Sequence, residues 1–589
     1  MRKKSKEKCE IEKEKSLETS FVIMEMVLTG IILVMFPWHS QLIFSGAEMQ
    51  FHLNKIEEIK HAVLNGTYPV ISTNTFNGVG YAINTFYPSL TIYPFIWCFL
   101  LPIGKINSFY TFIFIVFLLT EGITYCFAQK YFHKRIISVL FTNLVVCSGY
   151  MTFVYWFCYD LGEMLAFMAI TPFFFSLIKF SEREYSKLNW MVLAVSMSWI
   201  MLSHVLTAVL CVGVLIVFFL VFLIIKNTRR EKIQLLKSAI KSGFLFMLLT
   251  AVVVFPMLQG LITNNIHKPH QYLVPYRISH FMVSSIDNLV MTSNNLPQNM
   301  INIGTVLFIA LLFMLIHVQN IHGKIKAMVL ISLSGILLAS ELFPWKLVVK
   351  FLPAVQTVQF TFRIFIFVIL TITFSFCYYL IHESRTNSSL ISVSIFIICI
   401  NIIILCGSMV SFTTQGMQEE SLNYTPSVRK QPKYADFKVD SAHYNNLFAY
   451  YGGVGNSDYF TSEAFDNSSK IISGNLNKEK FFNLKRQNSV PNQIKFSGQV
   501  KRDFNNVKIP VLYYNDINYR VLLNGKSVKF HRNHIGTISL NTIRHGYYTI
   551  LIKAKPNKMF LYSGLLTALT ILGVFAYLMG WLLNKVVQK

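Results

Sequence analysis

Charged residues are scarce in this sequence. Of its 589 residues only 14% are Asp, Glu, Lys or Arg, whereas 53% are hydrophobic and 15% are aromatic. An average soluble domain carries about 25% charged residues, and many of the apolar runs here reach the roughly 18 residues that a transmembrane helix needs. The composition therefore excludes an ordinary soluble protein and indicates a polytopic α-helical membrane protein.

Acidic residues are scarcer than basic ones, which gives the chain a formal net charge of +25. A basic protein can bind nucleic acid, but Lys and Arg also collect in the cytoplasmic loops of membrane proteins. The second explanation fits a chain with so many apolar runs. We therefore expect membrane lipids, and no nucleic acid, among its partners.

The common motifs of soluble enzymes are also absent. The sequence contains no Gly-rich phosphate loop, no GxSxG, no HExxH and no CxxC. None of the nine cysteines falls in the long polar region 413–558, which excludes a disulfide or a thiolate metal site there. The other parts of the chain carry their cysteines almost entirely in apolar runs, where cysteine acts as a small hydrophobe.

About twelve apolar runs are predicted to cross the membrane. The first is too long for the apolar part of a signal peptide and no small-residue cleavage site follows it, so we expect a retained helix. The predicted spans are 21–43, 108–128, 136–153, 162–180, 188–203, 205–225, 238–260, 301–318, 326–343, 362–382, 389–411 and 559–583.

The run 88–104 decides the predicted topology. Its prolines Pro88, Pro94 and Pro102 favour a broken element at the membrane interface over a straight span. If this run does not cross, the basic loops between the later spans all lie on the cytoplasmic side, as the positive-inside rule requires. Both termini are then cytoplasmic and the region 413–558 lies outside.

The polar region 413–558 has a different pattern from the rest of the chain. Short alternating segments at 508–514, 519–525 and 547–554 are separated by the turn residues Asn515-Asp516, Asn524-Gly525 and His545-Gly546, which predicts strands and hairpins. The predicted organisation is a basic N-terminus (1–20), a bundle (21–412) with an external loop at 44–107, a β-rich extracytoplasmic domain (413–558), and a last helix with a short tail (559–589).

Ionisable residues near the outer ends of membrane helices are the candidate functional groups. Glu48 and His52 are four residues apart, so a helix places them on one face. A carboxylate at a cavity can accept a proton from a hydroxyl or hold a divalent metal. An interfacial helix with its polar face toward water explains the same spacing, and the nearby Lys55, Glu57, Glu58 and Lys60 favour that explanation.

Three further positions have a functional and an ordinary explanation. Asp160 and Glu163 begin an apolar run, where they form a second acidic site or simply cap a helix. His204 divides two apolar runs, where a histidine is most often a turn residue. Gln359 and Arg363 lie on roughly one face, and Arg363 suits a phosphate or an interfacial lipid headgroup.

Two more acids, Glu121 and Glu341, lie in or near apolar runs. Carboxyls in such places can indicate ion coupling. Secondary transporters usually show an inverted repeat with a pair of broken helices, and the sequence shows no such pair.

The order of these motifs resembles a known family. Acidic-x-x-Phe-His at 48–52, Gly-x-Tyr-Pro at 66–69, Asp-Leu-Gly-Glu-x-x-Ala at 160–166, Ser-His at 203–204 and Gln-Phe-x-x-Arg at 359–363 follow one another. With Phe-Tyr-Pro and the β-rich tail, this resembles the YfhO-like, or 6-pyruvoyl-tetrahydropterin synthase-related, bacterial membrane proteins. Those resemble members of the GT-C glycosyltransferase superfamily.

The resemblance implies an activity and a set of roles. GT-C enzymes move a sugar from a polyprenyl-phosphate carrier to an acceptor at the outer face of the cytoplasmic membrane, here a cell-envelope glycopolymer or glycolipid. Glu48 would be the general base or a metal ligand, at a position where the family more often has Asp. His52, Asp160, Glu163, His204 and Gln359 would bind substrate, Arg363 would bind the carrier phosphate, and a divalent Mg or Mn ion is a possible cofactor of the acids.

Two other functions remain open at this point. A non-catalytic flippase or envelope-assembly protein would use the same cavity, and a scaffold would bind wall polymer through its β-rich domain. A transporter should show polar residues along a path through the bundle, whereas the sequence places them at one surface, which favours the enzyme. Convergence of Glu48, Asp160, Glu163 and Arg363 in one pocket is the expected structural signature.

Overall fold

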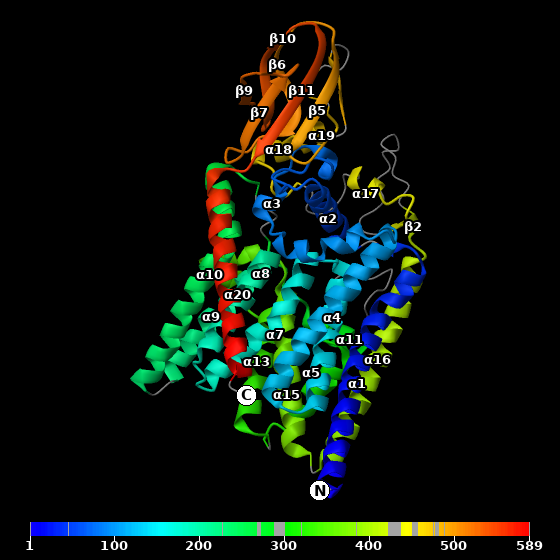
Figure 1. The fold of residues 1–589 in the computed structure, drawn as a ribbon, viewed down its shortest axis with the longest axis vertical. Coiled ribbons are helices and arrows are strands. Elements are labelled where there is room, and N and C mark those ends of the chain that lie inside the picture. The colour runs from blue at the N-terminus through cyan, green and yellow to red at the C-terminus, as the bar shows by residue number, and fades with distance from the viewer. Residues whose placement is uncertain are drawn as a thin grey trace.

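A computed structural model describes residues 2–44, 46–225, 228–267, 272–287, 301–319, 321–384, 386–421, 437–449, 457–474, 476–477, 482–487 and 489–587. In this part of the chain a bundle of helices carries a layer of short helices and a set of β-sheets at one end (Figure 1). The two labelled chain ends lie toward the opposite end of the bundle. The predicted combination of an apolar bundle and a β-rich C-terminal region is confirmed.

Eight helices of the described chain are long and apolar enough to cross a membrane. A bent pair, α5 (Arg135–Val146) with α6 (Gly149–Thr152) and the π-helix η3 (Phe153–Cys158), turns by 49° and is a ninth candidate. The eight helices are α1 (Arg2–His39), α4 (Lys105–Phe132), α7 (Leu161–Ser181), α9 (Val205–Ile225), α10 (Arg229–Thr263), α15 (Phe365–Glu383), α16 (Asn387–Gly416) and α20 (Lys558–Val587). The candidate span that contains α15 begins earlier, at Thr361.

Three of the predicted spans correspond to shorter helices. These are α8 (Lys187–Ser203), α12 (Thr305–Ile316) and α13 (Gly323–Ala339), with 17, 12 and 17 residues. A straight span needs about 20 residues, so length and composition do not confirm twelve crossings. All three belong to the bundle, because α8 packs on α7 and α10 and both α12 and α13 pack on α15.

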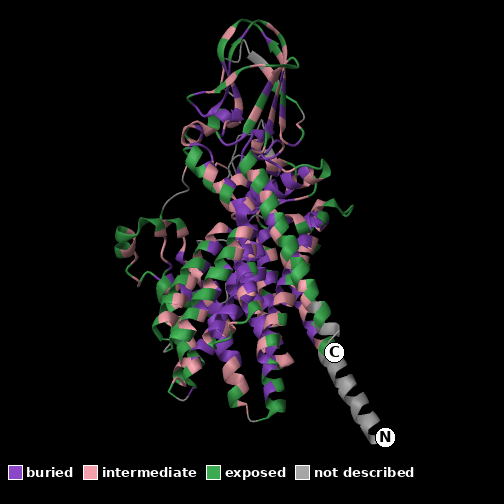
Figure 2. Cartoon of the chain, turned by 60° about the vertical axis from the view of Figure 1, so that its left-hand side comes forward, coloured by how far each residue is buried: buried purple, intermediate pink, exposed green. Residues whose placement is uncertain are grey.

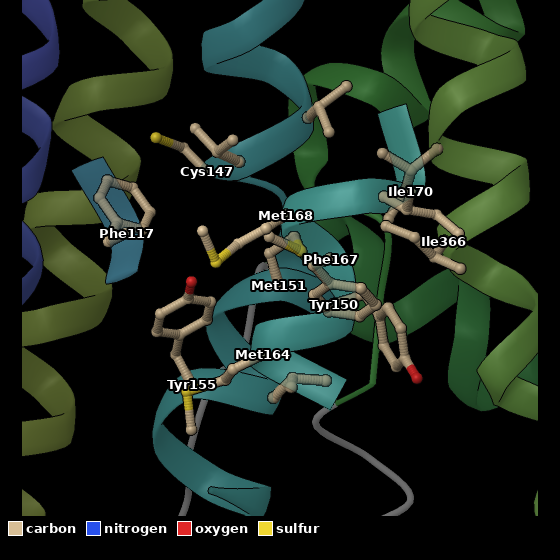
Figure 3. Packing of buried hydrophobic residues seen from close by; sticks show 14 of the residues in the cluster. Phe117, Cys147, Tyr150, Met151, Tyr155, Met164, Phe167, Met168, Ile170 and Ile366 are labelled. Atoms are coloured by element: carbon tan, nitrogen blue, oxygen red, sulfur yellow. The ribbon is translucent and has the colours of Figure 1, made fainter. Parts of the chain in front are cut away.

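Helix α7 is the centre of the bundle. All of its apolar stretch is buried, whereas only 11% of the corresponding stretch is buried in α9 and in α20. Figure 2 shows this contrast between the buried centre and the exposed periphery of the bundle. In Figure 3, Met164, Phe167 and Met168 of α7 pack beside Met151 and Tyr155 of the preceding bent segment. Polar groups at the start of α7 are consequently surrounded by other elements.

A juxtamembrane layer, residues 46–100, covers this end of the bundle. It contains α2 (Met49–Leu64), η1 (Phe76–Gly78), α3 (Ile83–Phe86) and the 3₁₀-helix η2 (Leu90–Leu100). Helix α2 ends at Leu64, shortly before Gly66, whose φ of +62° favours glycine. Helix η2 contains Pro94 and packs on α2, α4 and α8, in agreement with the prediction of a broken element.

The β-rich region contains two main sheets. One has the order β6 (Phe504–Leu512), β10 (Thr537–Ile543), β9 (Phe530–Arg532), and the other has the order β4 (Phe482–Arg486), β5 (Gln493–Val500), β11 (Gly546–Lys555), β7 (Asn518–Leu523), β8 (Lys526–Ser527). Every pairing in them is antiparallel. Side chains of both sheets, such as Ile509, Ile538, Val521 and Ile550, share one buried core, as in a sandwich.

The predicted turns have different outcomes. Asn524-Gly525 joins β7 to β8 with φ values of +47° and +81°, so this hairpin is confirmed. Asn515-Asp516 and His545-Gly546 do not form hairpins, because each lies between strands of different sheets. Period-2 patterns identify strands but do not reveal which strands pair, since that depends on distant partners.

Shorter elements complete the described chain. A small third sheet has the order β1 (Ile43–Phe44), β3 (Phe437–Val439), β2 (Glu420–Ser421). Asn264 after α10 ties the β-rich region to the bundle, because its side chain donates to Asp516 at 2.7 Å and accepts from the Asn515 amide at 2.8 Å. The remaining helices are α11 (Ile278–Asp287), α14 (Trp345–Phe351), η5 (Pro353–Val358), η6 (Thr361–Ile364), α17 (Asn446–Ala449), α18 (Ser462–Asp466) and α19 (Ser468–Ile472).

Candidate functional site

Two chain segments meet where α7 begins. The backbone amides of Ala47 and Glu48 donate to the carbonyl oxygens of Phe157 and Cys158 at 2.9 and 2.8 Å. A Cβ on Gly46 would stand 2.7 Å from the Tyr159 Cβ, so the contact requires glycine there. These contacts place the start of α2 directly against the turn that precedes α7.

Asp160 is the N-cap of α7. Its Oδ1 accepts from the Glu163 amide at 2.9 Å, and the preceding Tyr159 has a left-handed φ of 52° that ends the π-helix η3. The ordinary explanation from the sequence, a helix cap, is therefore correct. It does not account for the other groups around the same carboxylate.

Three side chains from distant segments surround the fully buried Asp160 carboxylate. His52 Nε2 of α2 lies 3.6 Å from Oδ1, and His204 Nε2, between α8 and α9, lies 3.4 Å from Oδ2. The Tyr87 hydroxyl donates to Oδ1 at 3.3 Å. A carboxylate that only capped a helix would not need two imidazoles and a phenol.

Glu48 completes the contact between α2 and α7. Its Oε2 lies 3.3 Å from His52 Nε2, so the imidazole stands between Glu48 and Asp160. The Glu48 side chain is 24% exposed, whereas those of His52 and Asp160 are 1% and 0% exposed. Glu48 is therefore the member of this group best placed to meet a molecule that enters from outside.

Burial and mutual charge set the protonation of these groups. Burial raises the pKa of Asp160, but His204 and His52 hold it well below its usual range. Burial lowers the pKa of His52, but hydrogen bonds with Asp160 and Glu48 outweigh that effect and raise it. Burial lowers the pKa of His204 to about 4, and burial with the Asp160 charge raises the pKa of Glu48. These shifts favour an ionised Asp160, a protonated His52 and a neutral His204.

Glu163 and Arg363 form the deeper part of the group. Tyr150 donates to Glu163 Oε1 at 2.7 Å, and the Arg363 charge acts on Glu163, Asp160 and Glu48. Arg363 is 6% exposed, yet its Nε and one terminal nitrogen have no hydrogen-bond partner among the described residues. Buried donors are almost always paired, so these two donor nitrogens are available to an acceptor that is not part of the protein.

The structure thus brings together six of the seven residues that the sequence proposed: Glu48, His52, Asp160, Glu163, His204 and Arg363. With Tyr87 we call them the polar cluster. Among the described contacts, none joins the Gln359 side chain to the polar cluster. Gln359 is half-buried at the end of η5 with a φ of 61°, and its carbonyl accepts from the Val274 amide at 2.7 Å.

Sequence reasoning misplaced two charged residues of α2, Lys55 and Glu58. Lys55 was expected on a water-facing surface, but it is 1% exposed and donates to the carbonyl oxygens of Pro88 and Tyr87 at 2.9 and 3.3 Å. Its Nζ stands 3.8 Å from the Tyr87 ring centroid. Burial lowers the pKa of Lys55 well below its usual range. Lys55 therefore positions Tyr87, and its i+3 spacing from His52 was the signal that it shares that face.

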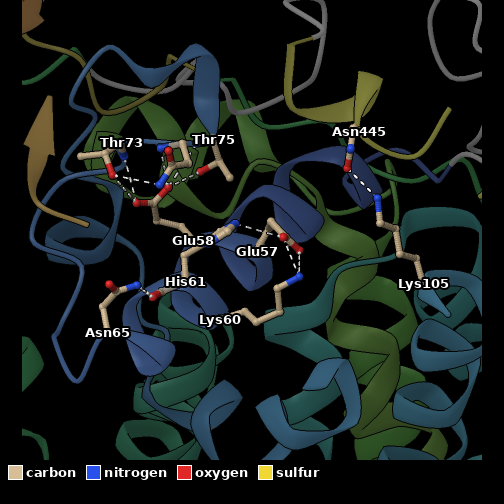
Figure 4. A network of polar contacts seen from close by, with 10 residues as sticks. Glu57, Glu58, Lys60, His61, Asn65, Thr73, Thr75, Lys105 and Asn445 are labelled. Carbon is tan, nitrogen blue, oxygen red and sulfur yellow. Dashed lines mark hydrogen bonds and ion pairs between the residues drawn. The ribbon is translucent and has the colours of Figure 1, made fainter. Parts of the chain in front are cut away.

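Glu58 was also expected in water and is buried as well. Its carboxylate accepts hydrogen bonds from the amides of Thr73, Asn74 and Thr75 and from the two threonine hydroxyls, at 2.9 to 3.2 Å. Figure 4 shows this contact beside the exposed-face group of Glu57, Lys60 and His61. Glu58 fixes the loop after α2 over the helix, which holds Glu48 and His52 in place.

The polar cluster has the donors for a divalent metal. The ligand atoms of Glu48, His52 and Asp160 lie within 4.8 Å of one another, as do those of Asp160, Glu163 and His204. Mg²⁺ prefers oxygen ligands, while imidazole nitrogen suits later transition metals. The mixed donors therefore fit Mn²⁺ better than Mg²⁺, with Asp160 shared between the two possible positions.

No known protein-family model matches this chain, and no curated protein matches it either. The polar cluster is therefore interpreted from its own geometry and chemistry.

Proposed function

We propose that this protein is an integral membrane glycosyltransferase of the GT-C type, which transfers a sugar from a polyprenyl-phosphate carrier to a cell-envelope glycopolymer or glycolipid. The observation that carries the proposal is the buried guanidinium of Arg363, which has two donor nitrogens without a hydrogen-bond partner among the described residues and whose charge acts on the partly exposed carboxylate of Glu48. A phosphate bound to a sugar supplies the acceptor oxygens, and an acceptor hydroxyl supplies the proton for the carboxylate.

The reaction follows from these positions. Glu48, in its ionised form, accepts the proton of the acceptor hydroxyl as the new bond from that oxygen to the sugar C1 forms. The bond from C1 to the phosphate oxygen breaks, and the carrier phosphate leaves with the electron pair. Arg363 and protonated His52 stabilise the negative charge that develops on that phosphate. Asp160 favours the protonated form of His52 and accepts a hydrogen bond from Tyr87.

The proposal includes the topology. Twelve crossings, with both termini cytoplasmic and residues 413–558 outside a bacterial cytoplasmic membrane, put the polar cluster at the outer surface. Figure 1 supports it, because the sheets and the juxtamembrane layer lie together at the end of the bundle that is opposite the termini. A lipid-linked sugar keeps its tail in the bilayer, so a reactive group at the helix ends is where its sugar phosphate would arrive.

A non-catalytic flippase or envelope-assembly protein is the second candidate function. The observation in its favour is that polar side chains do not lie only at one surface, as the sequence suggested, because Glu25, Glu121, Asn143 and Asn401 are buried within the helices. Their hydrogen bonds connect α1, α4, α5 and α16. They lie on other helices than the polar cluster, which leaves the enzyme as the better explanation of Arg363.

Glu48→Gln tests the enzyme proposal. Membranes that contain the variant should insert the protein normally but lose transfer of labelled sugar from the polyprenyl-phosphate pool to envelope glycan, because glutamine cannot accept the proton. Glu57→Gln is the matched control, since Glu57 lies on the same helix but pairs with Lys60 and His61. Unchanged envelope glycan in the Glu48→Gln strain, with the control also unchanged, would reject the catalytic role of Glu48.

A further inference from the structure

A second group of buried polar residues lies within the apolar helices, on elements that do not contribute to the polar cluster. Glu25 of α1 and Glu121 of α4 are 3% and 0% exposed and act electrostatically on each other. The titratable groups that face them from the packed helices are Cys147 after α5 and Tyr155 of η3, and neither supplies a positive charge. In the described chain no Lys or Arg pairs with either carboxyl.

The hydrogen bonds of Glu25 are fixed by two asparagines. Asn401 Nδ2 donates to Asn143 Oδ1 at 2.8 Å, which sets the orientation of the Asn143 amide. Asn143 Nδ2 then donates to Glu25 Oε1 at 2.7 Å. Glu25 Oε2 has no hydrogen-bond partner in the described part of the chain, and neither has Glu121 Oε2.

The Thr29 hydroxyl contacts more acceptor atoms than its one hydrogen can serve. Its Oγ lies 3.0 Å from the carbonyl oxygens of both Glu25 and Met26 and 2.6 Å from Glu121 Oε1. A threonine hydroxyl has one hydrogen, and in a helix it commonly donates to the carbonyl four residues earlier. A proton on Glu121 supplies the second hydrogen, because the carboxylic acid then donates to Thr29 Oγ while Thr29 donates to its own helix.

We propose that Glu25 and Glu121 form an intramembrane site that binds one exchangeable proton, carried by Glu121. Two adjacent carboxylates without a cation cannot both remain charged within an apolar bundle. A hard metal cation is a poorer fit, since such ions take six or more oxygen ligands and only two carboxylate oxygens here are unpaired. This inference is independent of the proposed transfer reaction.

Infrared spectroscopy of the purified full-length protein in detergent at neutral pH tests the proposal. The difference spectrum between the wild type and Glu121→Gln should show the loss of one carboxylic-acid C=O band, and that band should shift when H₂O is replaced by D₂O. Glu184→Gln is the control, because Glu184 is exposed and paired with Lys179, so it should lose only a carboxylate band.

Absence of a carboxylic-acid band in the wild type would overturn the proposal, and a band that disappears in Glu25→Gln but not in Glu121→Gln would overturn the assignment to Glu121. A band that does not respond to D₂O would show that the proton is not exchangeable. If Glu121→Gln does not fold, Thr29→Val keeps both carboxyls and should move the band to higher frequency, since the acid loses its hydrogen-bond acceptor. An unmoved band in Thr29→Val would contradict the hydrogen-bond assignment.

Discussion

Replacing Arg363 by methionine removes the buried guanidinium, which has two donor nitrogens without a hydrogen-bond partner among the described residues and whose charge acts on the carboxylates of the polar cluster. A hydrogen bond to a charged partner contributes about 1.5–3 kcal/mol, so two such bonds to a carrier phosphate contribute about 3–6 kcal/mol. That range corresponds to a loss of affinity of about 10²- to 10⁴-fold. Methionine fills similar space without a donor, so the folded bundle should tolerate the change.

Arg363→Lys separates charge from geometry. Lysine keeps the positive charge but has no planar fork for two parallel hydrogen bonds, so its affinity for the carrier should fall between those of the wild type and Arg363→Met. The assay is calorimetric titration of the purified protein with a polyprenyl phosphate in detergent, with thermal stability measured alongside. If Arg363→Met binds the polyprenyl phosphate as tightly as the wild type, Arg363 does not bind the phosphate and the central argument for the site fails.

Other expectations follow from the same contacts. Tyr87→Phe removes the 3.3 Å hydrogen bond to Asp160 and should lower sugar transfer about tenfold, whereas Tyr93→Phe, whose hydroxyl has no partner in the described chain, should leave transfer unchanged; equal rates in the two variants would contradict a role for the Tyr87 hydroxyl. Because the folded state raises the pKa of His52, the stability from His52 is fully present below its unfolded pKa of about 6.5 and is lost as pH rises through the folded pKa. The difference in melting temperature between the wild type and His52→Gln should accordingly shrink from pH 6 to pH 9, and a constant difference would show that His52 is not protonated. If Mn²⁺ binds Glu48, His52 and Asp160, it must displace the His52 proton, so titration calorimetry at pH 6 in two buffers of different ionisation enthalpy should show proton release that is absent in His52→Gln.

The sequence predicts the outline of the site because its residues obey local rules. Glu48 and His52 are one helical turn apart, and Asp160 has the position and residue type of an N-cap, so each could be placed on its own element. Their convergence is a property of the tertiary fold. It depends on the amides of Ala47 and Glu48 reaching the carbonyls of Phe157 and Cys158, a contact between segments more than 100 residues apart that no local pattern encodes.

Lys55 and Glu58 show why burial was harder to predict. A run of charged residues on a short helix normally marks a solvated face, and Glu57, Lys60 and His61 of α2 do form such a group. Glu58 instead accepts hydrogen bonds from amides of the loop that follows the helix, and Lys55 donates to carbonyl oxygens that follow α3, so backbone groups of other segments replace water as their partners. Polar backbone groups of a distant loop leave no trace in the periodicity of the helix itself.

In the proposed reaction, the two cations of the polar cluster are the groups that favour a phosphate over a neutral sugar. Arg363 and protonated His52 contribute two positive charges, while Asp160 and the ionised Glu48 contribute two negative ones, and Asp160 is already shared by His52, His204 and Tyr87. The raised pKa of Glu48 adds a carboxyl that gains a proton more readily than usual. An anion beside Arg363 raises the basicity of Glu48 further, since like charges disfavour ionisation. Arrival of the phosphate would thereby strengthen the base that must accept the acceptor's proton, which links binding of the carrier to activation of the hydroxyl.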